Sequence, residues 1–229
     1  EGLLGGTYEA AFLVAGVAGT AVGHALDARG SRVTFLALAV GSTGALLAAS
    51  VVTTAWAFAV LGAIGGGLVG AGGYYNATSA VMARLVPDER AHGITVLTLF
   101  GAFASPVFLP LIGWVVTRVG WRPTLRGLAL SVGLAYVVAA LAVPDVRPEE
   151  AQRPPFRRAV REATAGTDRR AIVVAVTVAG AVSALVIVQQ VPAMTGAGMA
   201  LATASAFAGA RGLLQLAGRL PLALSLIHI

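Results

Sequence analysis

Long apolar stretches alternate with short polar ones along the whole chain. Each apolar stretch is close to or above the length of about 20 residues that a helix needs to cross a bilayer. Alternation of apolar and polar positions, as expected of strands, is missing. The pattern predicts seven spanning helices, at residues 3–23, 33–51, 56–83, 93–117, 123–143, 171–191 and 199–220. It therefore indicates an all-α, polytopic membrane protein built as a helical bundle.

The connections between these helices alternate in charge. Three are short and contain few charges: 52–55, 118–122 and 192–198. The other three carry most of the arginines, with Arg29 and Arg32 in the first, Arg84 and Arg90 around the second, and seven more in the long segment 144–170. Arginine-rich loops stay in the cytoplasm. We therefore expect these three connections on the cytoplasmic side of an inner (plasma) membrane, in a multi-pass protein.

Composition supports a membrane solvent. Apolar residues make up 57% of the 229 residues and charged residues 11%, against roughly 45–50% and about 25% in soluble domains. The net charge of +6 comes from arginines between apolar spans, which fits the orientation rule better than a nucleic-acid surface. Cysteine is absent, which excludes disulfides and thiolate chemistry. All 16 basic residues are arginines, which points to a GC-rich, bacterial genome.

One charged segment carries a recognisable spacing. Gly23, Asp27, Gly30 and Arg32 follow the pattern Gly-x3-Asp-x2-Gly-x-Arg in a short hinge between two apolar segments. This resembles the cytoplasmic loop between the second and third helices of major facilitator superfamily (MFS) transporters. Two further segments are similar to the family's loop between helices four and five and to the start of its helix six: Pro87-Asp88-Glu89-Arg90-Ala91-His92-Gly93 and Gly120-Trp121-Arg122.

The resemblance implies a division of the chain. The family has two six-helix halves joined by a long cytoplasmic loop. Residues 1–143 would then carry helices two to six, 144–170 the connector and 171–223 helices seven and eight, so that helix one and helices nine to twelve lie outside. We expect 224–229 to be a non-native tail. Within the connector, 156–163 is either a basic helix on the lipid headgroups or part of a solvated tether.

The same resemblance assigns a conformational latch to the first charged segment. It implies that Asp27 is the latch acid, that Arg29 and Arg32 are its cationic partners, and that Gly23 and Gly30 allow close approach. Ala28 stands where the family usually has an arginine. The alternative is that the cluster only sets topology. Asp88 and Arg90 belong to the next cytoplasmic loop.

Two charges lie inside the predicted spans and away from their end turns. Insertion of a charge into the hydrocarbon costs about 2.5–3.5 kcal/mol, so Glu9 and Arg211 are functional candidates. The resemblance places them on cavity-lining helices two and eight. A cavity arginine suits a carboxylate, and a cavity glutamate suits proton coupling. Alternatively, Arg211 pairs with a helix outside the chain and Glu9 is hydrated near the outer surface.

Several uncharged polar residues are weaker cavity candidates. Tyr74, Tyr75 and Asn76 lie on the predicted span 56–83, which corresponds to the family's helix four. Gln189 and Gln190 lie on the span 171–191, which corresponds to its helix seven. Aromatic-belt positions or hydrogen bonds between helices explain them equally well.

Glycines on the predicted span 56–83 form a ridge. Gly62, Gly66 and Gly70 follow a small-x3-small pattern, which lets another helix approach closely. No Gly-Lys-Ser/Thr follows, so the run does not read as a phosphate loop. We interpret it as a packing feature.

These features favour a secondary active transporter of a small solute by alternating access. We expect the substrate to be an organic anion or a drug-like metabolite, with protons as a further partner beside the lipid bilayer. Gly101-x3-Ser105-Pro106 is similar to the family's antiporter motif, but Ser105 replaces its glycine, so symporter and antiporter both stay open. The alternative is a seven-helix receptor or sensor. We expect that the protein is not an enzyme and that it binds no cofactor, metal or nucleic acid.

Overall fold

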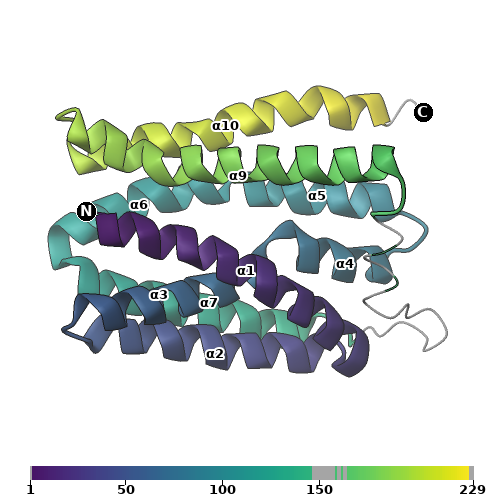
Figure 1. Cartoon of the computed structure of the whole chain (residues 1–229), viewed down its shortest axis with the longest axis horizontal. Helices are drawn as coiled ribbons and strands as arrows, with labels where there is room; N and C mark the ends of the chain where they lie inside the picture. The colour runs from purple at the N-terminus through teal and green to yellow at the C-terminus, as the bar shows by residue number, and fades with distance from the viewer. Residues whose placement is uncertain (1, 146–157, 159–160, 162–163, 227–229) are drawn as a thin grey trace.

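The structure, a computed structural model, describes residues 2–145, 158, 161 and 164–226. These residues form a bundle of helices that run side by side along its long axis (Figure 1). Its main helices are α1 (Gly2–Arg29), α2 (Ser31–Val51), α3 (Ala55–Gly73), α4 (Tyr75–Leu85), α5 (Arg90–Ala102), α6 (Ala104–Val119), α7 (Trp121–Ala142), α9 (Thr167–Gly196) and α10 (Leu201–Leu226). The described residues contain no strand, and the all-α prediction is confirmed. In lipid a helix satisfies its own backbone hydrogen bonds.

Most of the predicted spans have a counterpart in the bundle. Six helical segments of the described chain are long and apolar enough to cross a membrane. Their bounds are Gly5–Arg29, Ser31–Val51, Ala55–Leu85, Arg90–Val119, Trp121–Ala142 and Thr167–Gly196. The helix α10 occupies the place of the seventh predicted span, 199–220.

Two spans that we predicted as continuous are each broken once. The span 56–83 becomes α3 and α4, because Tyr74 has an extended backbone (φ −73°, ψ 159°) after two glycines. The span 93–117 becomes α5 and α6, which meet at Phe103. Three residues later, Pro106 has no amide hydrogen to offer the Ala102 carbonyl, so a regular helix does not run through this point.

The turns at both ends of the bundle are shorter than predicted. The charged hinge 23–32 is helical up to Arg29, and the chain reverses at Gly30 alone (φ 86°). In the same way 118–122 shrinks to Gly120 (φ 83°). Only glycine adopts such positive φ values without strain.

Other predicted boundaries also move. The helix α9 starts at Thr167 and runs through Pro192 to Gly196, so the turn predicted at 192–198 lies at 197–200. The connection 52–55 becomes 52–54. The candidate basic helix at 156–163 falls almost wholly outside the described residues.

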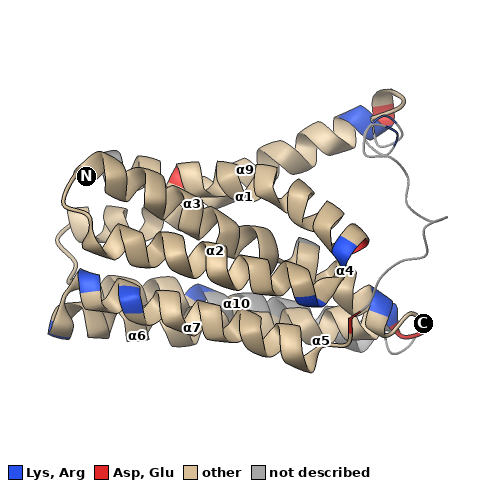
Figure 2. Ribbon diagram, turned by 90° about the horizontal axis from the view of Figure 1, so that it is seen from below, with Lys and Arg blue, Asp and Glu red and all other residues tan. Residues whose placement is uncertain are grey.

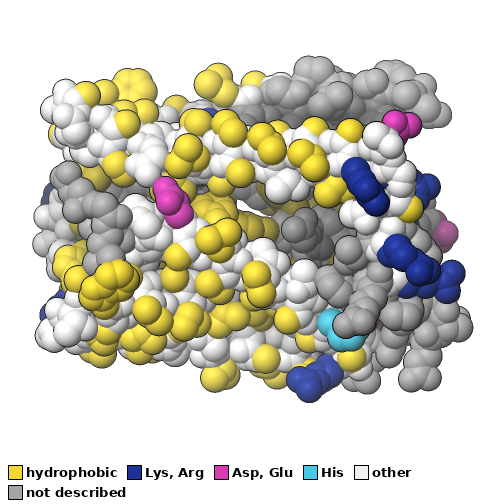
Figure 3. Space-filling model, in the orientation of Figure 1, with side chains coloured by type: hydrophobic (Ala, Val, Ile, Leu, Met, Phe, Trp, Pro, Cys, Tyr) yellow, Lys and Arg dark blue, Asp and Glu magenta, His cyan; other side chains and the backbone are white. Residues whose placement is uncertain are grey.

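The core lies where α1, α2, α3, α4 and α7 meet. Its buried members are Val22, Leu26, Phe35, Leu38, Ala39, Ala71, Ala77, Val81, Tyr136 and Ala140. The rings of Phe35 and Tyr136 stack at 6.1 Å between centroids, and the Tyr136 hydroxyl donates to the Val69 carbonyl over 2.8 Å. The face seen in Figure 3 exposes many apolar side chains, as expected of a bundle that contacts lipid.

The glycine ridge packs α3 against α1, as predicted. A Cβ added at Gly62 or Gly66 would lie 3.3 Å from side-chain carbons of Thr7 or Ala11, and one at Gly70 would lie 2.9 Å from Ala15. Each step of four residues on α3 matches a step of four on α1, so the two helices run parallel. This register brings the last turn of α1, with Asp27, beside the last turn of α4, with Arg84.

Candidate functional site

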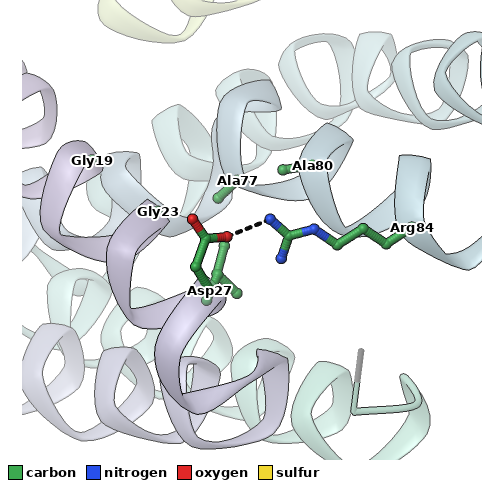
Figure 4. A pocket seen from close by; sticks show the side chains of 7 residues that line it. Gly19, Gly23, Asp27, Ala77, Ala80 and Arg84 are labelled. Atoms are coloured by element: carbon green, nitrogen blue, oxygen red, sulfur yellow. Dashed lines mark hydrogen bonds and ion pairs between the residues drawn. The ribbon is translucent and has the colours of Figure 1, made fainter. Parts of the chain in front are cut away.

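An ion pair joins α1 to α4 at one end of the bundle (Figure 4). Nη2 of Arg84, in the last turn of α4, donates to Oδ1 of Asp27 over 2.5 Å. The two side chains are 25% and 36% exposed, respectively. The pair is therefore partly shielded from solvent and ties together the last turns of α1 and α4.

A cavity of about 210 Å³ opens beside this pair. Small residues of the facing helices leave the space, because glycine and alanine have little or no side chain: Gly19, Gly23, Ala77 and Ala80. Nη1 of Arg84 is buried and has no hydrogen-bond partner among the described residues. The site therefore offers one unused donor next to a neutralised charge pair.

The partner of Asp27 differs from the one expected. We expected Arg29 and Arg32, but Gly30 reverses the chain between them, and Arg32 lies on α2 beyond the turn. There its Nε donates to the Ala140 carbonyl over 3.2 Å, which ties α2 to α7. Arg29 is exposed at the end of α1.

Arg84 was not predicted from the sequence as the partner of Asp27. The glycine ridge indicates where this partner lies. Residues that face each other on α1 and α3 differ by 55 in number, as Thr7 and Gly62 do, and the same offset places residue 82 opposite Asp27. Arg84 is the nearest cation to that position. The glycines of the motif behave differently: Gly23 lines the cavity, and Gly30 makes the turn.

Most of the charged residues lie toward the two ends of the bundle (Figure 2). Asp88, in the turn between α4 and α5, and Arg90, the first residue of α5, are exposed and close in sequence to Arg84. The ends of α1, α4 and α7 and the starts of α2, α5 and α9 thus share one end. The prediction that Asp27 and Arg90 lie on the same side agrees with this arrangement.

The two helix breaks lie at similar depth. Tyr74 is 11 residues from the end of α4, and Phe103 is 13 residues from the start of α5, or about 16 and 20 Å at 1.5 Å per residue. The hydroxyl of Tyr75 lies 2.6 Å from the position of a Cβ on Gly101, so the two broken spans touch here. Such breaks interrupt the backbone hydrogen-bond ladder inside the bundle.

Arg211 projects from α10 near the second break. Two residues before it, a Cβ on Gly209 would lie 3.1 Å from the Ser105 carbonyl oxygen, so α10 packs closely on the start of α6. Arg211 is half-buried, and its Nε is buried without a hydrogen-bond partner among the described residues. It is a cation in the bundle that no described acid neutralises.

The remaining candidates are not gathered around Arg211 by any described contact. Glu9 is exposed on α1, where no ion pair with another described residue forms. The side-chain amide of Gln189 lies 3.6 Å from the Cβ position of Gly5, which brings the start of α1 next to α9. Gln190 is half-buried. The side chain of Asn76 lies outside the described part of the structure.

A family model settles the identity of this bundle. The model described as Major Facilitator Superfamily matches residues 2–225. The chain belongs to the major facilitator superfamily. Neither the curated proteins nor the solved structures gave a match. Membership of this family supports a multi-pass membrane transporter and favours transport over the seven-helix receptor alternative.

Proposed function

We propose that the chain belongs to a secondary active transporter that moves a small organic anion by alternating access. The observation that carries this proposal is the buried Nε of Arg211, which lacks a partner among the described residues. A guanidinium inside a membrane protein is costly unless a counter-charge balances it. A carboxylate substrate supplies that counter-charge and matches the planar, two-pronged donor edge of arginine.

The surroundings of Arg211 support a substrate site at this depth. Many transporters bind substrates beside interrupted helices near the middle of the membrane. Here the break at Phe103 lies on the helix pair against which α10 packs, and the break at Tyr74 adjoins it through Tyr75 and Gly101. We assign Tyr75 and Asn76, with Gln189 and Gln190, to candidate polar walls of the same pathway.

We further propose that the transport is coupled to protons through Glu9. In the described helices it is the one acid that lies away from the first and last turns. A carboxyl group in a transport pathway can exchange a proton as the two sides open in turn. Asp27 and Arg84 would act as the latch at the cytoplasmic end.

The test is uptake into proteoliposomes by the twelve-helix protein that the family resemblance implies. We expect saturable uptake of organic anions that depends on an imposed proton gradient, and no uptake of sugars or cationic drugs. Selective uptake of a cationic drug would contradict the anion proposal. Gradient-independent anion uptake would contradict proton coupling but leave the anion site standing.

A further inference from the structure

Two arginines flank the turn at Gly120, one in the last turn of α6 and one in the first turn of α7, and each is stacked on a tryptophan. Cζ of Arg118 lies 5.0 Å from the ring centroid of Trp114, and Cζ of Arg122 lies 5.0 Å from that of Trp121. Guanidinium groups over indole rings are held by cation–π attraction. A stacked guanidinium keeps its N–H groups at its edges, where they remain available to an oxyanion.

The two arginines differ in their other contacts. Nη2 of Arg122 donates to the Val52 carbonyl over 3.0 Å, at the end of α2, so part of its donor capacity is used. Arg118 is exposed and makes no hydrogen bond or ion pair with a described residue. The donors of Arg118 are therefore free, whereas those of Arg122 are partly used.

No described acid balances this pair of charges. The connections that meet at this end, 52–54, 120 and 197–200, contain no acidic residue. Glu9, the first described acid on α1, lies seven residues beyond Gly2, or about 10 Å along the helix axis. Arg126 adds a further positive charge and donates to the Ser50 hydroxyl over 3.0 Å. Among the described residues this end is cationic, and it therefore attracts an external anion.

The tryptophans set the depth of this cluster in the membrane. Trp114 is 53% exposed and Trp121 is 46% exposed, at the ends of two spanning helices. Tryptophan favours the level of the lipid headgroups. The anion most abundant at that level is the phosphate of a phospholipid, which arginine binds through two parallel hydrogen bonds.

We propose that Arg118 and Arg122 form a binding site for the headgroup of an anionic phospholipid in the leaflet at this end. The site is separate from Arg211 and does not depend on the transported substrate. A zwitterionic headgroup brings its own ammonium group into a cluster that already has excess positive charge. An anionic headgroup such as phosphatidylglycerol leaves its negative charge uncompensated and is favoured.

The chain carries its own probes for this site. It has three tryptophans, so Trp56→Phe leaves Trp114 and Trp121 as the reporters. Nanodiscs of phosphatidylcholine would contain a small fraction of either brominated phosphatidylglycerol or brominated phosphatidylcholine, and tryptophan quenching would be measured. We expect about fivefold enrichment of the brominated anionic lipid, the factor that one arginine near the surface supplies.

Two substitutions on this background decide the outcome. Arg118→Gln should remove most of the enrichment, whereas Arg161→Gln, an exposed arginine beyond α7 in sequence, should leave it unchanged. Circular dichroism would verify that both variants keep their helix content. Equal quenching by the two lipids, or full enrichment in Arg118→Gln, would overturn the proposal. Loss of the enrichment when inorganic phosphate is added would assign the site to a free anion and also overturn the lipid proposal.

Discussion

Arg84 on α4 meets Asp27 on α1 because the glycines of α3 hold these two parallel spans in a fixed register. The contact is a single 2.5 Å hydrogen-bonded ion pair beside a cavity of about 210 Å³. Both residues lie at the ends of their helices, in the last turns of α1 and α4. The pair therefore connects the close packing of glycines in the membrane to the arrangement of charges at its surface.

Reversing either charge should destabilise the bundle, and reversing both should restore part of the loss. We expect Asp27→Arg and Arg84→Asp each to lower the free energy of unfolding by about 1–2 kcal/mol, between the values for exposed and buried pairs. Thermal unfolding in detergent would measure the singles and the double variant. A double variant whose loss equals the sum of the two single losses would mean that the residues do not interact.

The packing of α3 on α1 predicts a strong contrast between two glycines. A Cβ on Gly67 would lie 3.0 Å from the Ala11 backbone oxygen and still closer to the Val14 side chain. Gly67→Ala should therefore lower the melting temperature. Gly16→Ala is the matched control, because a Cβ there meets nothing within 4 Å and alanine is favoured over glycine in a helix by about 1 kcal/mol. Equal effects of the two substitutions would contradict the described interface.

Several of these features follow from the sequence alone, and others do not. Lipid demands long apolar helices, so hydropathy located the spans. The breaks at Tyr74 and Phe103 stayed hidden because apolar residues continue on both sides of each. Arg211 was found because a charge stands out in an apolar run. The partner of Asp27 was missed because it depends on how two distant helices align, which local spacing does not encode.

Arg122 and Arg118 should differ in their effect on stability. Arg122 donates to the Val52 carbonyl, and a hydrogen bond from a charged group contributes about 1.5–3 kcal/mol. Arg122→Gln should therefore destabilise the chain in neutral detergent. Arg118→Gln should leave its melting temperature nearly unchanged, since Arg118 makes no hydrogen bond with a described residue. A larger loss for Arg118→Gln than for Arg122→Gln would argue against the described contacts.

The inferred orientation can be tested with single cysteines, because the chain has none of its own. Glu89→Cys lies in the turn before α5, and Thr53→Cys lies in the turn between α2 and α3. In intact cells a membrane-impermeant maleimide should label Thr53→Cys only. Glu89→Cys should react after the membrane is permeabilised. The reverse pattern would place the arginine-rich connections outside the cytoplasm.

The most direct test of the account is transport by Arg211 variants in the twelve-helix protein that the resemblance implies. If Arg211 binds an anionic substrate, Arg211→Ala should abolish uptake, and Arg211→Lys should impair it strongly although the charge is kept, because a point-like ammonium does not reproduce the planar fork. Surface expression and helix content would be matched first. Uptake by Arg211→Ala at the parental rate and affinity would make Arg211 a structural residue and contradict the anion site.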